Sequence, residues 1–246
     1  MAKLKTYVAM ILDKSGSMCS IINEARTNFN EQLQVLKEES DSESAVAKKI
    51  LLEADDAANI DGIETRVTVV AFNNNVDFIM FDEDVSYANE ISKEDYLPSG
   101  TTALFDAIGL TIEKFQKHYT DLDDPNVGIL FNIITDGMEN SSKMYEGETG
   151  RKKLKSLMDE LQQQNWTFTF MGTENVVEQA QDLGFSIGNT VVFSADPEGM
   201  KTLSSTHLGG LRSYYGARAE MSVSSTSESI KDFYSQEEEK ENDDQS

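Results

Sequence analysis

Cysteine and histidine are scarce in this sequence of 246 residues, which contains one cysteine, Cys19, and two histidines. A single cysteine excludes an intramolecular disulfide and a cysteine-rich zinc site, and it favours a reducing compartment. We therefore expect a cytoplasmic protein in which Cys19 is a buried structural residue. His118 and His207 lie far apart in the sequence and belong to no motif with metal-ligand spacing, so we assign them no role.

Long apolar runs are also missing, because no stretch approaches the roughly 20 apolar residues that a membrane-spanning helix needs. Basic residues are few: 21 lysines and arginines stand against 44 acidic residues, which gives a net charge of −23. Such a charge repels phosphate backbones and anionic lipids, and it attracts cations. We therefore expect neither nucleic acid nor a membrane surface as a main partner.

Two polar segments interrupt the apolar pattern. Residues 39–64 form an acidic insert, and residues 222–246 form a serine-rich and then acidic tail. The tail carries eight acidic residues and two lysines, so −17 of the net charge of −23 belongs to residues 1–221. A segment of this composition buries too little apolar area to offset the entropy lost on ordering. We predict one domain over residues 1–221 and a disordered tail over residues 222–246.

Apolar runs bounded by turn residues predict the strands of this domain, and the stretches between them predict its helices. The predicted strands cover residues 6–12, 65–72, 76–81, 127–135, 166–171 and 190–193. The predicted helices cover residues 20–38, 103–118, 149–164, 174–183 and 197–215. This alternation indicates an α/β fold with a doubly wound, mostly parallel central sheet and helices on both faces. Because only three asparagines separate the second and third strands, we expect one antiparallel hairpin strand at the sheet edge.

Oxygen-bearing side chains follow two of the predicted strands. Asp13, Ser15 and Ser17 form the pattern D-x-S-x-S directly after the first strand, and Asp136 follows the fourth. A third group, the Gly-Thr-Thr stretch at residues 100–102, precedes a predicted helix. In open α/β sheets, ligands bind beyond the carboxyl ends of the strands. We therefore expect the three segments to deliver their oxygens to the same edge of the sheet.

Hydroxyl and carboxylate oxygens are the ligands that hard divalent cations prefer, and Mg²⁺ usually keeps bound waters as well. Two carboxylates roughly neutralise such an ion, while neutral hydroxyls leave it able to accept a further oxygen ligand. Any one of the three segments alone also fits a turn that caps a helix. The three together predict a divalent metal site. Glu139 and Asn140 nearby fit either contacts with the metal ligands or a polar loop, and we favour the polar loop.

In this order, the D-x-S-x-S motif, the Gly-Thr-Thr stretch and the later Thr-Asp-Gly resemble the metal-ion-dependent adhesion site of the von Willebrand factor A-like family. The resemblance covers about residues 5–195. It implies a Rossmann-like fold that binds Mg²⁺, with Mn²⁺ or Ca²⁺ as alternatives, and it favours Thr102 over Thr101 as a ligand. The residues that it assigns to the metal are Asp13, Ser15, Ser17, Thr102 and Asp136.

In that family, a glutamate or aspartate of a protein partner commonly completes the coordination of the metal. The resemblance therefore implies a protein-binding module and not an enzyme, with an unidentified partner that presents Asp or Glu. The acidic tail at residues 222–246 offers the same kind of ligand, so we consider it a candidate competitor for the metal.

Two other functions stay open at this point. A Mg²⁺-dependent phosphotransferase of the haloacid-dehalogenase type also has an aspartate after its first strand. Its chemistry needs a second carboxylate two residues later, where this chain has Ser15. The other alternative is a structural component in which the metal site stays vacant.

Overall fold

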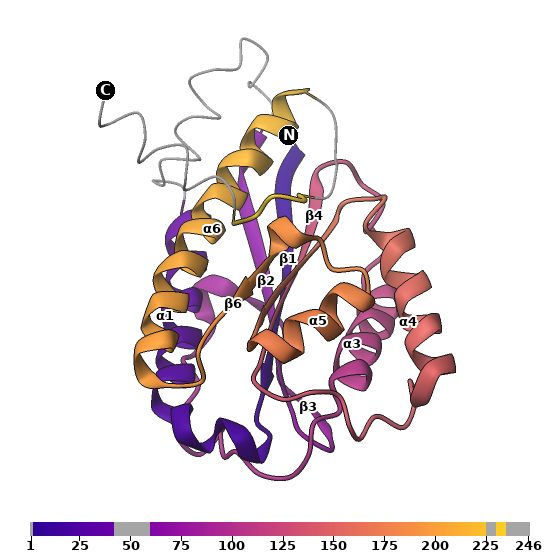
Figure 1. The fold of residues 1–246 in the computed structure, drawn as a ribbon. Helices are drawn as coiled ribbons and strands as arrows, with labels where there is room; N and C mark the ends of the chain where they lie inside the picture. Colours follow the sequence, from indigo (N-terminus) through magenta and orange to yellow (C-terminus); the bar gives the residue numbers. More distant parts are fainter. Residues whose placement is uncertain (1, 42–59, 225–229, 235–246) are drawn as a thin grey trace, which may run out of the picture.

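The computed structural model describes residues 2–41, 60–224 and 230–234, and its centre is a six-stranded sheet in the order β3-β2-β1-β4-β5-β6 (Figure 1). The strands are β1 (Ala2–Asp13), β2 (Ile60–Phe72), β3 (Val76–Asp84), β4 (Val127–Thr135), β5 (Trp166–Gly172) and β6 (Thr190–Val192). All neighbouring strands pair in parallel except β2 and β3, which form an antiparallel hairpin at the sheet edge. The predicted fold class and the predicted hairpin are confirmed.

Helices cover both faces of this sheet (Figure 1). The longer ones are α1 (Ile22–Ser40), α3 (Leu104–His118), α4 (Gly147–Leu161), α5 (Glu174–Asp182) and α6 (Pro197–Ser224). Buried residues of α3, α4 and α5 pack on one face of the sheet, and those of α1 and α6 pack on the other. None of the helices in the described part of the chain is long and apolar enough to cross a membrane.

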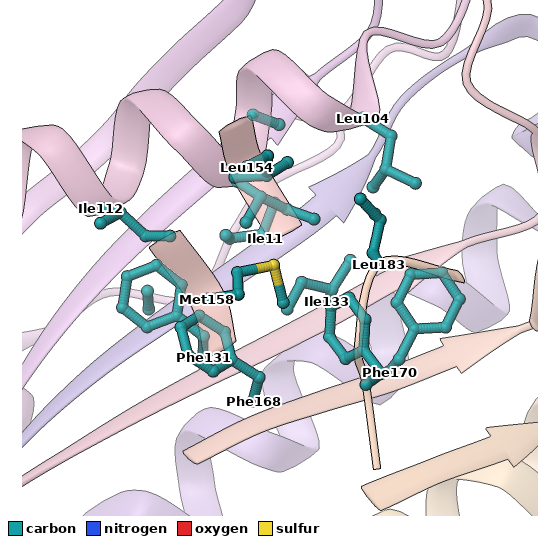
Figure 2. Packing of buried hydrophobic residues seen from close by; sticks show 14 of the residues in the cluster. Ile11, Leu104, Ile112, Phe131, Ile133, Leu154, Met158, Phe168, Phe170 and Leu183 are labelled. Atoms are coloured by element: carbon teal, nitrogen blue, oxygen red, sulfur yellow. The ribbon is translucent and has the colours of Figure 1, made fainter. Parts of the chain in front are cut away.

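The central strands are buried along their whole length because they are covered on both sides. Every residue of β4 and of β5 is buried, as expected for parallel strands between two helical layers. Figure 2 shows the core beneath α3 and α4, where Phe131 and Ile133 of β4 pack beside Met158 and Leu154. This core fixes the strand ends, and the loops at those ends carry the predicted site.

Cys19 differs from the prediction, because it is exposed. It belongs to a short 3₁₀-helix, η1 (Gly16–Ile21), in which Met18 and Ile21 are buried. With about three residues per turn, positions 18 and 21 share one side of such a helix, and position 19 points elsewhere. The Cys19 Sγ lies 3.7 Å from the carbonyl oxygen of Pro98 at the surface.

The predicted boundary at residue 221 is wrong for a short C-terminal stretch. Helix α6 continues to Ser224, and beyond it Ile230 and Phe233 are buried against the domain. The side chain of Asn189 donates to the Ile230 carbonyl at 2.5 Å and accepts from the Phe233 amide at 2.9 Å. The prediction of disorder rested on the average acidic composition of the tail, to which these few apolar residues contribute little.

The ends of the predicted insert also belong to regular elements, since α1 reaches Ser40 and β2 begins at Ile60. Most of the insert, residues 42–59, lies outside the described residues. The same holds for residues 225–229 and 235–246 of the predicted tail, so its disorder stays a prediction.

His207 is fully buried on α6, where its Nδ1 lies 2.8 Å from the Tyr234 hydroxyl. Burial lowers the pKa of His207 from 6.5 to about 3. The unfolded chain therefore binds a proton below about pH 6.5 that the folded chain does not bind, so stability falls as the pH drops. We expect His207 to lower the free energy of unfolding by about 2 kcal/mol at about pH 5.

Urea unfolding at neutral pH and at about pH 5, for the wild type and for His207→Gln, measures this effect. The variant should lose less stability on acidification than the wild type. An identical pH dependence in both proteins would contradict the role given to His207.

Candidate metal centre

The two predicted aspartate ligands lie at the ends of neighbouring strands, at the same edge of the sheet, which is the lower edge in Figure 1. Asp13 is the last residue of β1, and Asp136 follows the last residue of β4. The parallel register pairs Leu12 with Ile134, so both chains emerge at the same level. The loops after β1 and β4 are thereby brought together, as the sequence analysis predicts.

A chain of hydrogen bonds joins the side chains of these two loops. One carboxylate oxygen of Asp13 accepts from the Ser15 amide at 2.6 Å, and the other accepts from the Thr135 hydroxyl at 2.5 Å. The Ser15 and Ser17 hydroxyl oxygens are 3.1 Å apart, and the Ser17 hydroxyl donates to Asp136 Oδ1 at 2.5 Å. Four of the five predicted ligands thus form one connected cluster.

Thr102, the fifth predicted ligand, joins this cluster beside Gly137. A Cβ atom built on Gly137 would lie 2.6 Å from Thr102 Oγ1, 3.4 Å from Asp13 Oδ2 and 3.5 Å from Ser15 Oγ. Oxygens of the β1 loop and of the segment before α3 therefore surround one point next to the loop after β4, and this point is open because residue 137 has no side chain. Thr102 is buried, whereas Thr101 is exposed, so the structure brings Thr102 and not Thr101 to the cluster.

Backbone hydrogen bonds join the loop after β1 to the end of β2 and to the segment before α3. The Lys14 amide donates to the Phe72 carbonyl at 2.6 Å, and the Lys14 carbonyl accepts from the Ser99 amide at 2.8 Å. The Gly16 amide donates to the Gly100 carbonyl at 3.1 Å. Gly100 has a φ of +77° and packs directly against a side chain of the loop after β2, a position that disfavours other residues. The loops are therefore linked through their backbones as well as their side chains.

Tyr96 forms a hydrogen bond with the backbone of the oxygen cluster. Its side chain is fully buried, and its hydroxyl donates to the Asp13 carbonyl at 2.7 Å. The neighbouring Leu97 is 64% exposed. Tyr96 thus fixes the end of β1, while Leu97 faces solvent in the same loop.

Burial opposes ionisation of both carboxylates. It raises the pKa of Asp13 to about 6, although hydrogen bonds from Thr135 and Ser15 oppose the shift, and the charge of Asp136 adds to it. Burial also raises the pKa of Asp136, against the effect of the Ser17 hydroxyl. A cation beside both groups would favour their charged forms, because it offsets the lost hydration and their mutual repulsion.

Glu139 and Asn140 do more than form a polar loop, the interpretation that the sequence analysis favoured over contacts around the metal ligands. Asn140 forms two hydrogen bonds with the backbone of Thr102, and Glu139 accepts from the Phe105 amide at 2.8 Å. The available signal was the start of α3, where Ala103 stands at the capping position and cannot supply a side-chain acceptor. The acceptor for this helix start comes from the loop after β4 instead.

The donor set fits a hard divalent cation. Within the described ranges, no group of three or more His, Cys, Asp and Glu side chains has an arrangement that could hold a metal ion. A metal at this edge would therefore depend on the hydroxyls of Ser15, Ser17 and Thr102 together with the two aspartates. Neutral hydroxyls and carboxylates are oxygen ligands of the kind that Mg²⁺, Mn²⁺ and Ca²⁺ accept.

Searches of protein-family models and of curated protein sequences found no match to this chain. Solved structures do match. A von Willebrand factor type A protein from Catenulispora acidiphila is 16% identical, with a TM-score of 0.49 over 85% of this chain and 43% of that protein. Manganese-loaded TRAP protein from Plasmodium vivax is 15% identical, with a TM-score of 0.49 over 81% of this chain and 72% of that one.

A mutant of the PilB minor pilin from Streptococcus sanguinis is 13% identical, with a TM-score of 0.53 over 90% of this chain and 64% of the pilin. The chain spans less than half the length of several of the matched proteins, such as 45% of the VWA2 protein of Sulfolobus acidocaldarius. At these identities, the comparisons bear on the fold alone. The chain therefore has the doubly wound α/β fold that its motifs lead us to expect of a von Willebrand factor A-like domain.

Proposed function

We propose that this protein is a metal-dependent protein-binding module. Its site would hold a divalent cation, and an aspartate or glutamate of a protein partner would complete the coordination. The observation that carries the proposal is that oxygens of Asp13, Ser15 and Thr102 converge on the space that Gly137 leaves open, while Asp136 joins them through Ser17. The residues that would hold the cation are Asp13, Ser15, Ser17, Thr102 and Asp136.

Mg²⁺ is the cation that we propose, with Mn²⁺ and Ca²⁺ as alternatives. Only two of the five proposed ligands carry charge, so they balance a divalent ion without excess. The ion would keep its attraction for a further oxygen anion, because three ligands are neutral hydroxyls. Mg²⁺ also retains waters readily, and a carboxylate from a partner would replace one of them.

Binding is a better account of this site than phosphoryl transfer. The phosphotransferase alternative needs a carboxylate where this chain has Ser15, and the Ser15 hydroxyl is instead paired with Ser17 at 3.1 Å. Ser15 can neither form the second carboxylate nor act as the general acid of that chemistry. An assay with a generic phosphate ester tests this point, since hydrolysis that requires Asp13 would favour the enzyme.

Mg²⁺ should stabilise the folded protein, because the proposed ligands converge only in the folded state. At a free Mg²⁺ concentration 100-fold above the dissociation constant, binding adds about 2.7 kcal/mol to the free energy of unfolding. For a chain of this size, that corresponds to a rise of roughly 5–10 °C in the melting temperature. Thermal unfolding in MgCl₂ and in EDTA measures the difference.

The matched control is Asp136→Asn, which keeps the size of the side chain and removes its charge. This variant should melt at nearly the same temperature in both solutions. Equal melting temperatures for the wild type in MgCl₂ and EDTA would contradict metal binding.

Capture of partners from a native lysate with and without EDTA tests the other part of the proposal, that a protein partner binds through the metal. A partner retained in EDTA does not use the metal.

A further inference from the structure

The loop that follows β4 is attached to the start of α3 by several hydrogen bonds, and these lie next to the candidate metal centre. Its first residue, Asp136, belongs to the oxygen cluster, and the next, Gly137, lies against it. Its next residues contact the segment that carries Thr102. The loop is therefore placed to control how two of the three ligand segments sit relative to each other.

Asn140 binds both polar groups of the Thr102 backbone. The Thr102 amide donates to Asn140 Oδ1 at 2.9 Å, and the Asn140 amide donates to the Thr102 carbonyl at 3.0 Å. These two hydrogen bonds fix the distance between the Thr102 backbone and the loop after β4. They also fix the orientation of the Thr102 backbone. The direction of the Thr102 hydroxyl toward Asp13 and Ser15 follows from that orientation.

Glu139 fixes the same segment one turn further on. Its Oε2 accepts from the Phe105 amide at 2.8 Å, and its Oε1 accepts from the amides of Ser141 and Ser142 at 2.8 and 2.7 Å. A carboxylate at this position satisfies a free amide and complements the positive end of the helix dipole. The first turn of α3 thus receives its cap from the loop after β4.

Asp106 makes the attachment reciprocal. Its carboxylate, on the first turn of α3, accepts from the amides of Lys143 and Tyr145 at 2.7 and 2.9 Å. On the other side, the Glu139 amide donates to the Gln179 side chain of α5 at 2.9 Å. The loop after β4 is therefore held at both ends of the stretch that contacts Thr102, and Asn140 lies within that stretch.

We propose that Asn140 is a positioning residue for the metal centre, which sets the place of the Thr102 hydroxyl relative to Asp13 and Asp136. This inference rests on the proposed metal binding. Metal–oxygen distances tolerate deviations of only about 0.2 Å, so a ligand that gains freedom loses much of its contribution. Groups that orient metal ligands typically change metal affinity by about 10- to 100-fold when they are removed.

Titration calorimetry with MgCl₂ on the full chain tests the inference with three variants. Asn140→Ala removes the side-chain acceptor, and we expect the dissociation constant to rise about 10-fold or more. Asn140→Asp keeps an acceptor for the Thr102 amide. We expect its dissociation constant for Mg²⁺ to be at most about 3-fold higher than that of the wild type. Asn175→Ala changes an exposed asparagine at the start of α5 and should bind like the wild type.

Thermal unfolding in EDTA provides a readout that separates positioning from a structural role. Because Asn140 is exposed, Asn140→Ala should melt in EDTA close to the wild type while it loses affinity for Mg²⁺. A fall in the EDTA melting temperature with an unchanged dissociation constant would overturn the inference. Equal loss of affinity in the alanine and aspartate variants would overturn it as well.

The result for the wild type distinguishes the two proposals. If the wild type shows no heat of Mg²⁺ binding, the proposed function fails, and the inference about Asn140 fails with it. If the wild type binds Mg²⁺ and Asn140→Ala binds equally tightly, only the inference fails, and the metal site stands.

Discussion

Replacement of Asp13 by alanine should abolish measurable Mg²⁺ binding, with a rise in the dissociation constant of roughly 100-fold or more. Asp13 is fully buried, and its carboxylate is the point at which the β1 loop and Thr135 of β4 meet. It would supply one of two negative charges to the cation. Its loss leaves a dication beside Asp136 alone, and it removes the acceptor that orients the Ser15 segment.

Titration calorimetry and the shift in melting temperature caused by MgCl₂ both measure this effect. The matched control is Asp77→Ala, which removes a carboxylate near the same edge, where Asp77 pairs with Lys14 at 2.6 Å. That aspartate is not part of the oxygen cluster, so Mg²⁺ should bind the control within about 3-fold of the wild type. Comparable loss in both variants would show that overall negative charge attracts the ion, rather than a built site.

Replacement of Gly137 by alanine should have a comparable effect through a different cause. The added methyl group would lie 2.6 Å from Thr102 Oγ1 and within 3.5 Å of oxygens of Asp13 and Ser15. It would occupy the space on which these oxygens converge and push the Thr102 hydroxyl away. We expect the dissociation constant for Mg²⁺ to rise by about 10- to 100-fold or more, although every proposed ligand is still present.

The backbone at Gly137 is not in a left-handed conformation, which among the glycines of the described residues is found at Gly100, Gly147 and Gly184. The effect of the alanine is therefore steric. Gly216→Ala on α6 is the matched control, because no described atom lies within 4 Å of its added Cβ apart from its chain neighbours and the nearby backbone of its own helix. That control should bind Mg²⁺ normally and gain about 0.5–1 kcal/mol of stability. Normal Mg²⁺ binding by Gly137→Ala would place the ion, if any, elsewhere.

The fold could be predicted from the sequence because its central strands are rich in apolar residues and are bounded by turn residues. The runs that become β4 and β5 are buried at every residue, so no other arrangement satisfies them as well as a sheet between two helical layers. Asp13 and Asp136 are the first acidic residues after two such runs, which made their common edge predictable.

Other features depend on contacts between segments that are distant in the sequence. Cys19 is exposed because Met18 and Ile21 take the buried side of η1. Ile230 and Phe233 pack on the domain because Asn189 pairs with their backbone, 41 and 44 residues away. The average composition of a segment cannot show that a few of its apolar residues pack on the domain.

The sequence by itself determined which atoms are available at the candidate site, because ligand chemistry depends on residue type and the strand pattern places those residues at one edge. Only the tertiary structure decided that Thr102 and not Thr101 faces the cluster, that Gly137 leaves its centre open, and that Asn140 holds Thr102 in place. Residue spacing along one strand indicates an edge of the sheet. The direction of a side chain in a loop follows from hydrogen bonds to other loops, and those partners become known only when the chain has folded.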